Sequence, residues 1–155
     1  MRKSGTSILT QIKFSRAHAA GIIGGKIYAI DIDPEMIKII KNKARTNNLS
    51  NVVTVLRDFV SESSGLEDSS VDYVMFFNIL HAENPENLLK EAYRILRKGV
   101  RLGIIHWNYN EAISGLPLHI KPRPKDCRRW AESVGFNFEY QVDLKPYHFG
   151  MVMRK

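Results

Sequence analysis

Short apolar runs alternate with amphipathic stretches along most of the chain. The runs are rich in β-branched residues, and the most apolar one, residues 71–79, is continuously hydrophobic, which is typical of a strand covered on both faces of a sheet. The stretches between them repeat apolar residues at helical spacing. The pattern predicts strands at 26–31, 52–56, 71–79, 102–107, 136–142 and 149–153, and helices at 15–23, 34–47, 85–98 and 124–134.

The order of these elements predicts an α/β fold. Alternating strands and helices indicate a mostly parallel, doubly wound sheet with right-handed crossovers and helices on both faces. Only the short stretch 143–148 joins the last two strands, so we expect them to form a C-terminal antiparallel hairpin. We find no linker or repeat, and we therefore expect a single domain over residues 1–155.

Polar side chains follow several of the predicted strands. Asp31 ends the first of them, and a helix begins at once with Asp33 as its N-cap and Pro34 in its first turn. A carboxylate at the tip of a parallel strand commonly holds the hydroxyls of a ribose. Carboxyl ends of other strands carry Asp58, Asn78, His81 and His106. We expect these side chains to converge on one edge of the sheet, where ligands of such sheets bind.

Composition narrows the class of protein. The chain has 155 residues, 44% of them hydrophobic and 25% charged, as in an ordinary globular domain. No apolar run approaches the ~20 residues that span a bilayer, and no signal peptide is evident, so we expect a cytoplasmic protein without a membrane partner. The one cysteine, Cys127, excludes an internal disulfide and a cysteine-based zinc cage. Its spacing from Trp130, Ala131 and Val134 favours a core position, and we predict no metal site.

The net charge is +7, and basic residues gather near the N-terminus and at 121–129. Such clusters suit a nucleic-acid or anionic-substrate surface. They also suit a solvated surface on a basic protein, and we favour that interpretation.

The chain resembles the class I S-adenosylmethionine-dependent methyltransferases, in the type 11 group that includes ubiquinone-biosynthesis enzymes. The resemblance is collinear over residues 26–153 and its fold is Rossmann-like. Four motifs carry it: IYAIDIDPEM at 27–36, RDF at 57–59, EDSSVDYVMFFNILH at 67–81 and LLKEAYRILRKG at 88–99.

The resemblance implies roles for five residues toward S-adenosylmethionine. Asp31 would hold the ribose hydroxyls and Ile32 would press on the adenine face. Asp58 would accept from the adenine amino group, the backbone of Phe59 would contact the ring, and Asn78 would line the methionine end. From the residues alone, Asp58 could instead cap a turn, and Asn78 could satisfy nearby backbone.

The chain departs from the family at its first strand and glycine-rich loop. Residues 7–14 stand in their place without a glycine, so the segment 1–14 is atypical, and 14–25 resume as the family's first helix. A truncation, an altered reading frame or divergence would each produce this pattern. On β-propensity we expect residues 6–14 to form a substitute strand. Two alternatives stay open: another chain supplies the strand, or 26–31 and 71–79 pair directly.

The expected function is methyl transfer to a small-molecule acceptor, impaired by the missing loop. In-line displacement needs mostly positioning, so no side chain is identified as catalytic. His81, His106 and Trp107 are the candidates to face the acceptor. One alternative is a non-catalytic module that serves binding or dimerisation. Under that alternative the chain could form a homodimer. A nucleic-acid methyltransferase is disfavoured, since Asn78 is not followed by the Pro-Pro-aromatic motif of enzymes that hold a flipped base.

Overall fold

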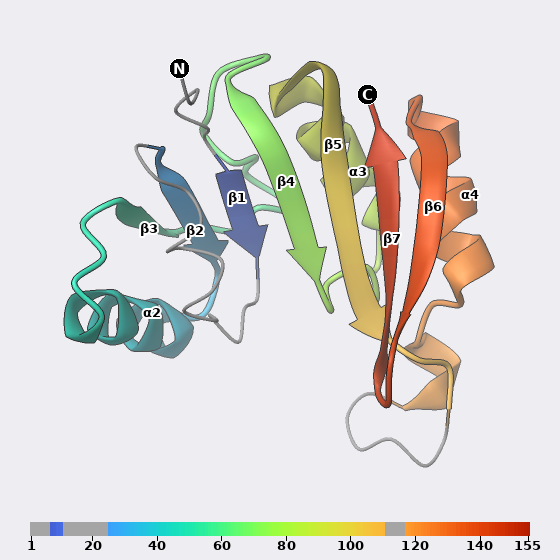
Figure 1. Cartoon of the computed structure of the whole chain (residues 1–155), viewed down its shortest axis with the longest axis horizontal. Coiled ribbons are helices and arrows are strands. Elements are labelled where there is room, and N and C mark those ends of the chain that lie inside the picture. The colour runs from blue at the N-terminus through green and yellow to red at the C-terminus, as the bar shows by residue number, and fades with distance from the viewer. Residues whose placement is uncertain (1–6, 11–24, 111–116) are drawn as a thin grey trace.

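The computed structural model describes residues 7–10, 25–110 and 117–155. They form a seven-stranded sheet with helices on both faces (Figure 1). The strands are β1 (Ser7–Thr10), β2 (Ile27–Asp31), β3 (Val52–Leu56), β4 (Val71–Phe77), β5 (Leu96–Trp107), β6 (Asn137–Leu144) and β7 (His148–Arg154). The helices are α2 (Pro34–Thr46), α3 (Pro85–Ile95), α4 (Pro124–Val134) and the short 3-10 helix η1 (Leu118–Ile120).

Strand β1 lies inside the sheet, whose order is β3-β2-β1-β4-β5-β7-β6. It runs parallel to both neighbours, with Ser7 opposite Ile27 of β2 on one side and Tyr73 of β4 on the other. The predicted substitute strand is therefore confirmed over Ser7–Thr10. Direct pairing of β2 with β4, the alternative, does not occur. The short helix expected at 15–23 lies outside the described residues.

The two faces of the sheet carry separate apolar clusters. In β2, Ile27 and Ala29 pack with Ile40 of α2 on one face. Ile30 points to the other face and joins the larger cluster that α3 and α4 cover. The alternation follows from the strand's two-residue period, and it confirms the doubly wound, Rossmann-like arrangement. Figure 1 shows α3 and α4 behind the sheet and α2 beside β2 and β3.

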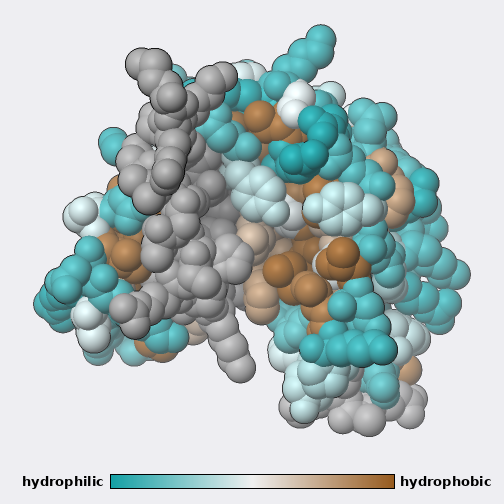
Figure 2. All heavy atoms as spheres, viewed as in Figure 1, coloured by the Kyte–Doolittle hydropathy of each residue, from teal (hydrophilic) through white to brown (hydrophobic). Residues whose placement is uncertain are grey.

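The C-terminal hairpin is antiparallel, as predicted. Strand β7 pairs with β5 on one side and with β6 on the other. Both hairpin strands are longer than expected, because β6 reaches Leu144 and β7 begins at His148. Figure 2 shows hydrophobic residues exposed over the middle of the sheet, on the face turned away from α3 and α4.

Three further predicted boundaries are wrong: the end of α3, the end of β4 and the start of β5, which is Leu96 rather than residue 102. Helix α3 ends at Ile95 rather than near residue 98, because Leu96 already pairs with Val71 of β4 as the first residue of β5. Gly99, expected to stop the helix, adopts a φ of 80° within β5. Strand β4 ends at Phe77 rather than residue 79, since Asn78 turns into the left-handed region with a φ of 53°.

Candidate functional site

Asp31 lies at the carboxyl end of β2 and is buried, with 6% of its surface exposed. Its Oδ1 accepts a hydrogen bond of 2.9 Å from the backbone N–H of Asp33. Asp33 in turn caps α2, since its carboxylate accepts from the N–H of Glu35 at 2.9 Å. The other oxygen of Asp31, Oδ2, is buried without a hydrogen-bond partner in the part of the chain that the structure describes. The junction between β2 and α2 thus holds the Asp31 carboxylate, whose Oδ2 can accept a hydrogen bond from a ligand.

A small cleft brings Asp31 together with Ile32, Asp58 and Phe59. It measures about 40 Å³, and its other lining residues are Ile30, Arg57, Val60 and Ile79. Ile32 is 62% exposed, so its side chain offers an apolar surface beside the carboxylate. Phe59 is buried and packs edge-to-face on Phe76, with 6.1 Å between ring centroids.

Asp58 caps the turn that follows it. Its Oδ1 accepts from the N–H groups of Val60 and Ser61, at 3.0 and 3.2 Å, and its Oδ2 accepts from the Ser61 hydroxyl at 2.6 Å. These hydrogen bonds lower the pKa of the Asp58 carboxyl, and the bond from the Ser61 hydroxyl has the largest effect. The turn-capping alternative is therefore realised. Oδ2 has one identified donor, and a carboxylate oxygen can accept a second.

Asn78 lies at the end of β4 and faces the hairpin. Its N–H donates to the carbonyl of Ile105 at 2.8 Å, and its side-chain Nδ2 lies 3.4 Å from Nε2 of His148. Its Oδ1 is buried and has no hydrogen-bond partner among the described residues. A left-handed backbone is tolerated better by asparagine than by most residues, which is how this side chain turns inward at the strand end.

The half-buried His81 and the fully buried His106 lie side by side, with 5.9 Å between ring centroids. His106 is fully buried, and neither of its ring nitrogens has a hydrogen-bond partner of good geometry in the described residues. Burial, followed by the effect of His81, lowers the pKa of His106 to about 4. Burial also lowers the pKa of His81, whose Nδ1 is likewise unpartnered in that part of the chain. Both imidazoles are therefore mainly neutral at neutral pH.

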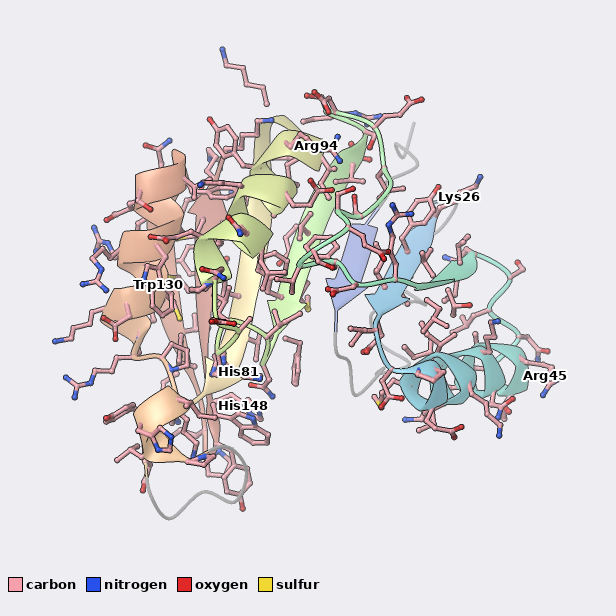
Figure 3. All side chains as sticks on the ribbon, turned by 180° about the vertical axis from the view of Figure 1, so that it is seen from behind. Lys26, Arg45, His81, Arg94, Trp130 and His148 are labelled. Atoms are coloured by element: carbon pink, nitrogen blue, oxygen red, sulfur yellow. The ribbon has the colours of Figure 1, made fainter. Side chains whose placement is uncertain are left out.

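Trp107 lies on the opposite face of β5 from His106. Its ring stacks on His148 of β7, with 4.2 Å between centroids, and Phe77 lies 5.5 Å from the same imidazole. Figure 3 shows His81 and His148 at the same end of the sheet. Sequence reasoning missed His148, because its place opposite Trp107 depends on the register of the hairpin. It also missed Lys121, which is buried and donates to the carbonyl of Asn110 at 3.2 Å.

The predicted site residues thus fall into two adjoining groups. One surrounds the cleft at Asp31, and the other surrounds Asn78 at the ends of β4 and β5; Ile79 lines the cleft directly after Asn78. Five buried side-chain atoms lack a hydrogen-bond partner among the described residues, and all belong to this edge: Asp31 Oδ2, Asn78 Oδ1, His81 Nδ1 and both ring nitrogens of His106. Buried polar atoms are normally paired, so their concentration marks a place where a ligand or water is needed.

The basic segment 121–129 is engaged in contacts within the chain. Arg128 pairs with Glu132 at 2.8 Å and lies over the Phe138 ring at 4.1 Å. Arg123 lies 4.6 Å over Tyr109. Arg123 and Arg128 are exposed, which agrees with the solvated-surface interpretation, whereas Lys121 of the same segment is buried and does not fit it. Cys127 is buried in the core and burial raises the pKa of its thiol to about 12, which argues against a nucleophile.

In 7–10, 25–110 and 117–155, no group of three or more His, Cys, Asp or Glu side chains is placed to hold a metal ion. None of the helices in those ranges is long and apolar enough to cross a membrane.

Comparison with known proteins identifies the family. Residues 11–104 match the protein-family model of a methyltransferase domain, Methyltransf_11. The chain is 29% identical over 157 residues to the ubiquinone/menaquinone biosynthesis C-methyltransferase UbiE of Rhodopseudomonas palustris (strain TIE-1), covering 92% of this chain and 59% of that protein. It is 35% identical over 78 residues to the mitochondrial 2-methoxy-6-polyprenyl-1,4-benzoquinol methylase of Arabidopsis thaliana, covering 49% and 27%. The chain therefore spans less than two thirds of the length of either relative.

Solved structures share the fold. A SAM dependent methyltransferase from Aquifex aeolicus superposes with a TM-score of 0.80 at 23% identity, covering 98% of this chain and 82% of that one. A putative type 11 methyltransferase from Sulfolobus solfataricus superposes with a TM-score of 0.73 at 27% identity, covering 97% of this chain and 84% of that one. The family match and these neighbours agree with the motifs and with the sheet. The chain therefore belongs to the class I S-adenosylmethionine-dependent methyltransferases.

Proposed function

We propose that this chain binds S-adenosylmethionine at the carboxyl edge of its sheet and transfers the methyl group to a small-molecule acceptor. The observation that carries the proposal is the gathering of unpartnered buried polar atoms on Asp31, Asn78, His81 and His106. Membership of the methyltransferase family supports the choice of cofactor. The role of each residue is part of the proposal.

The residues around the cleft suit an adenosine. Asp31 Oδ2 is a buried acceptor in need of donors, and a ribose diol supplies two hydroxyl donors. The exposed side chain of Ile32 would pack on the adenine face, the backbone of Phe59 would contact the ring, and Asp58 Oδ2 would accept from the amino group. When bound, the cofactor supplies an electrophilic methyl on a sulfonium.

The residues at the ends of β4 and β5 suit an acceptor with polar hydrogens. Asn78 Oδ1 would accept from the methionine end of the cofactor, and the neutral imidazoles of His81 and His106 each have a nitrogen lone pair for a hydroxyl. A neutral imidazole can also take the proton that leaves the acceptor. Trp107 would border the acceptor on the other face of β5. The relatives named for ubiquinone/menaquinone biosynthesis and for a benzoquinol make a small quinol-like ring our first candidate.

Calorimetric titration with S-adenosylmethionine tests the proposal. We expect saturable binding, and we expect Asp31→Asn to weaken it about 10- to 150-fold, because hydrogen bonds to a charged acceptor contribute ~1.5–3 kcal/mol. The matched control is Asp33→Asn, two residues away, since asparagine is also a good N-cap and the side chain of Asp33 caps α2. We expect the control variant to bind as the unmodified chain does.

The rival is a methyltransferase fold that binds without chemistry or not at all. The small volume of the cleft, about 40 Å³, favours it, since an adenosine needs more room. A folded chain with a dissociation constant weaker than about 1 mM would retain only ~4 kcal/mol of binding and would contradict the enzyme proposal.

A further inference from the structure

A second concave surface lies on the outer side of α2, along the edge strand β3. It is an open depression of about 510 Å³, lined by Pro34, Ile37, Lys38, Lys41, Asn42, Arg45 and Leu56. We call it the α2 groove. Its volume is within the range of ligand-binding sites, ~300–1,000 Å³. None of the residues assigned above to the cofactor or the acceptor lines it.

The helical side of the α2 groove is cationic. Lys38, Lys41 and Arg45 follow each other at spacings of three and four residues, so they lie along one side of α2 over ~10 Å. In the part of the chain that the structure describes, no carboxylate pairs with any of these three cations, and Arg45 donates only to the side-chain oxygen of Asn42, at 2.9 Å. Figure 3 shows Arg45 at the outer end of α2, and Figure 2 shows hydrophilic residues over this end of the molecule.

The strand side of the α2 groove is apolar. Leu56 ends β3 and is 57% exposed, although it is a large aliphatic side chain. Pro34 and the largely buried Ile37 continue the apolar surface toward the helix. Strand β3 is the outermost strand at this end of the sheet. A ligand in the groove therefore meets aliphatic carbon on one side and a row of positive charge on the other.

We propose that the α2 groove binds an acidic segment of a partner protein that carries aliphatic side chains between its acids. The charges are complementary, and an aliphatic side chain of the partner removes Leu56 from water. Three alternatives fit less well. A lone phosphate needs converging cations rather than a row, a nucleic-acid strand needs aromatic side chains for stacking, and a membrane needs an apolar surface that protrudes.

The test uses a fluorescent peptide of about ten residues in which Glu and Leu alternate, measured by anisotropy at about 50 mM salt. We expect saturable binding, weakened about tenfold by Lys41→Glu. The matched control is Lys43→Glu, which reverses the same charge on the same helix outside the groove. We expect Lys43→Glu to weaken binding less than about twofold, and Leu56→Gln to weaken it severalfold. Circular dichroism establishes that each variant is folded.

Several results would overturn the proposal. One is equal weakening by Lys41→Glu and Lys43→Glu, which would mean general attraction to a basic protein. Another is absence of binding by the folded chain, or equal binding of a peptide with Ser in place of Leu. Tighter binding of an oligouridylate or of phosphatidylserine vesicles, with the same dependence on Lys41, would assign the groove to phosphates instead. Asp31→Asn should leave peptide binding unchanged, which separates this test from that of the cofactor site.

Discussion

At the scale of single residues, His106 is a polar side chain that is fully buried and has lost its hydrogen bonds to water. Its ring packs beside Phe149, with 6.2 Å between centroids, and beside His81. Burial is the largest cause of the lowered pKa of His106, and charge repulsion from His81 when it is protonated, from His148 and from Lys121 adds to it, while the backbone of Trp107 opposes it. The fold therefore depends on this side chain being neutral.

Because the fold requires a neutral His106, we predict that the free energy of unfolding falls at acid pH. The pKa of His106 falls from an ordinary 6.5 to about 4, so the unfolded chain binds the proton more readily between these values. Stability is thus complete above pH 6.5 and is lost as the pH falls toward 4. When the pH is lowered from neutral to about 5, we expect protonation of His106 in the unfolded chain to reduce the unfolding free energy by about 2 kcal/mol. Urea unfolding of His106→Phe should lack that loss.

The control for this prediction is His119→Phe, at an exposed position in η1. It should keep the acid-dependent loss of the unmodified chain. Equal losses in His106→Phe and the unmodified chain would assign the acid sensitivity to other groups.

At the scale of elements, Glu91 of α3 ties down the segment between β3 and β4. Its Oε1 accepts from the N–H of Ser64 at 2.8 Å and from the Ser64 hydroxyl at 2.6 Å. Arg94, one turn later, donates to Glu91 and to the carbonyl of Leu66, both at 2.7 Å. Burial would raise the pKa of Glu91, but the bonds from Arg94 and Ser64 together lower it to about 2. The segment that follows Asp58 is thereby fixed to a helix.

We predict that Glu91→Gln lowers the unfolding free energy by about 2 kcal/mol at neutral pH, because charge-assisted hydrogen bonds are lost. The lowered pKa means that this contribution is present above pH 4.5 and shrinks as the pH falls toward 2. Chemical unfolding at neutral and acid pH measures the difference. Glu86→Gln, an exposed change in the first turn of α3, is the control and should cost less. A constant difference at both pH values would contradict the linkage.

At the scale of the whole molecule, hydrophobic pattern predicts most of the element order. It fails at Leu96, because LLKEAYRILRKG favours a helix and only the long-range pairing with Val71 makes Leu96 a strand residue. It also could not find the contact between Asn78 and His148, which lie 70 positions apart and meet through the hairpin's register. The carboxylate of Asp31 was predictable, since a strand end followed at once by a capped helix is a local signal.

The position of β1 yields a prediction at this scale. Its backbone pairs on both sides, with β2 and with β4, so a proline there removes a ladder hydrogen bond and distorts the strand between two neighbours. We expect Leu9→Pro to cost about 3 kcal/mol or more. Thermal unfolding compares it with Leu9→Val, which keeps the backbone N–H. Equal melting temperatures for the two variants would mean that β1 contributes little to the sheet.

The place of β1 also bears on synthesis. Among the described strands of this sheet it is synthesised first, yet Tyr73–Phe76, the β4 residues it pairs with, are made about 65 residues later. At roughly 5–20 residues per second, the nascent segment waits on the order of 3–13 s with one edge bare. During that interval it is open to chaperones and to the same segment on a neighbouring polysome chain.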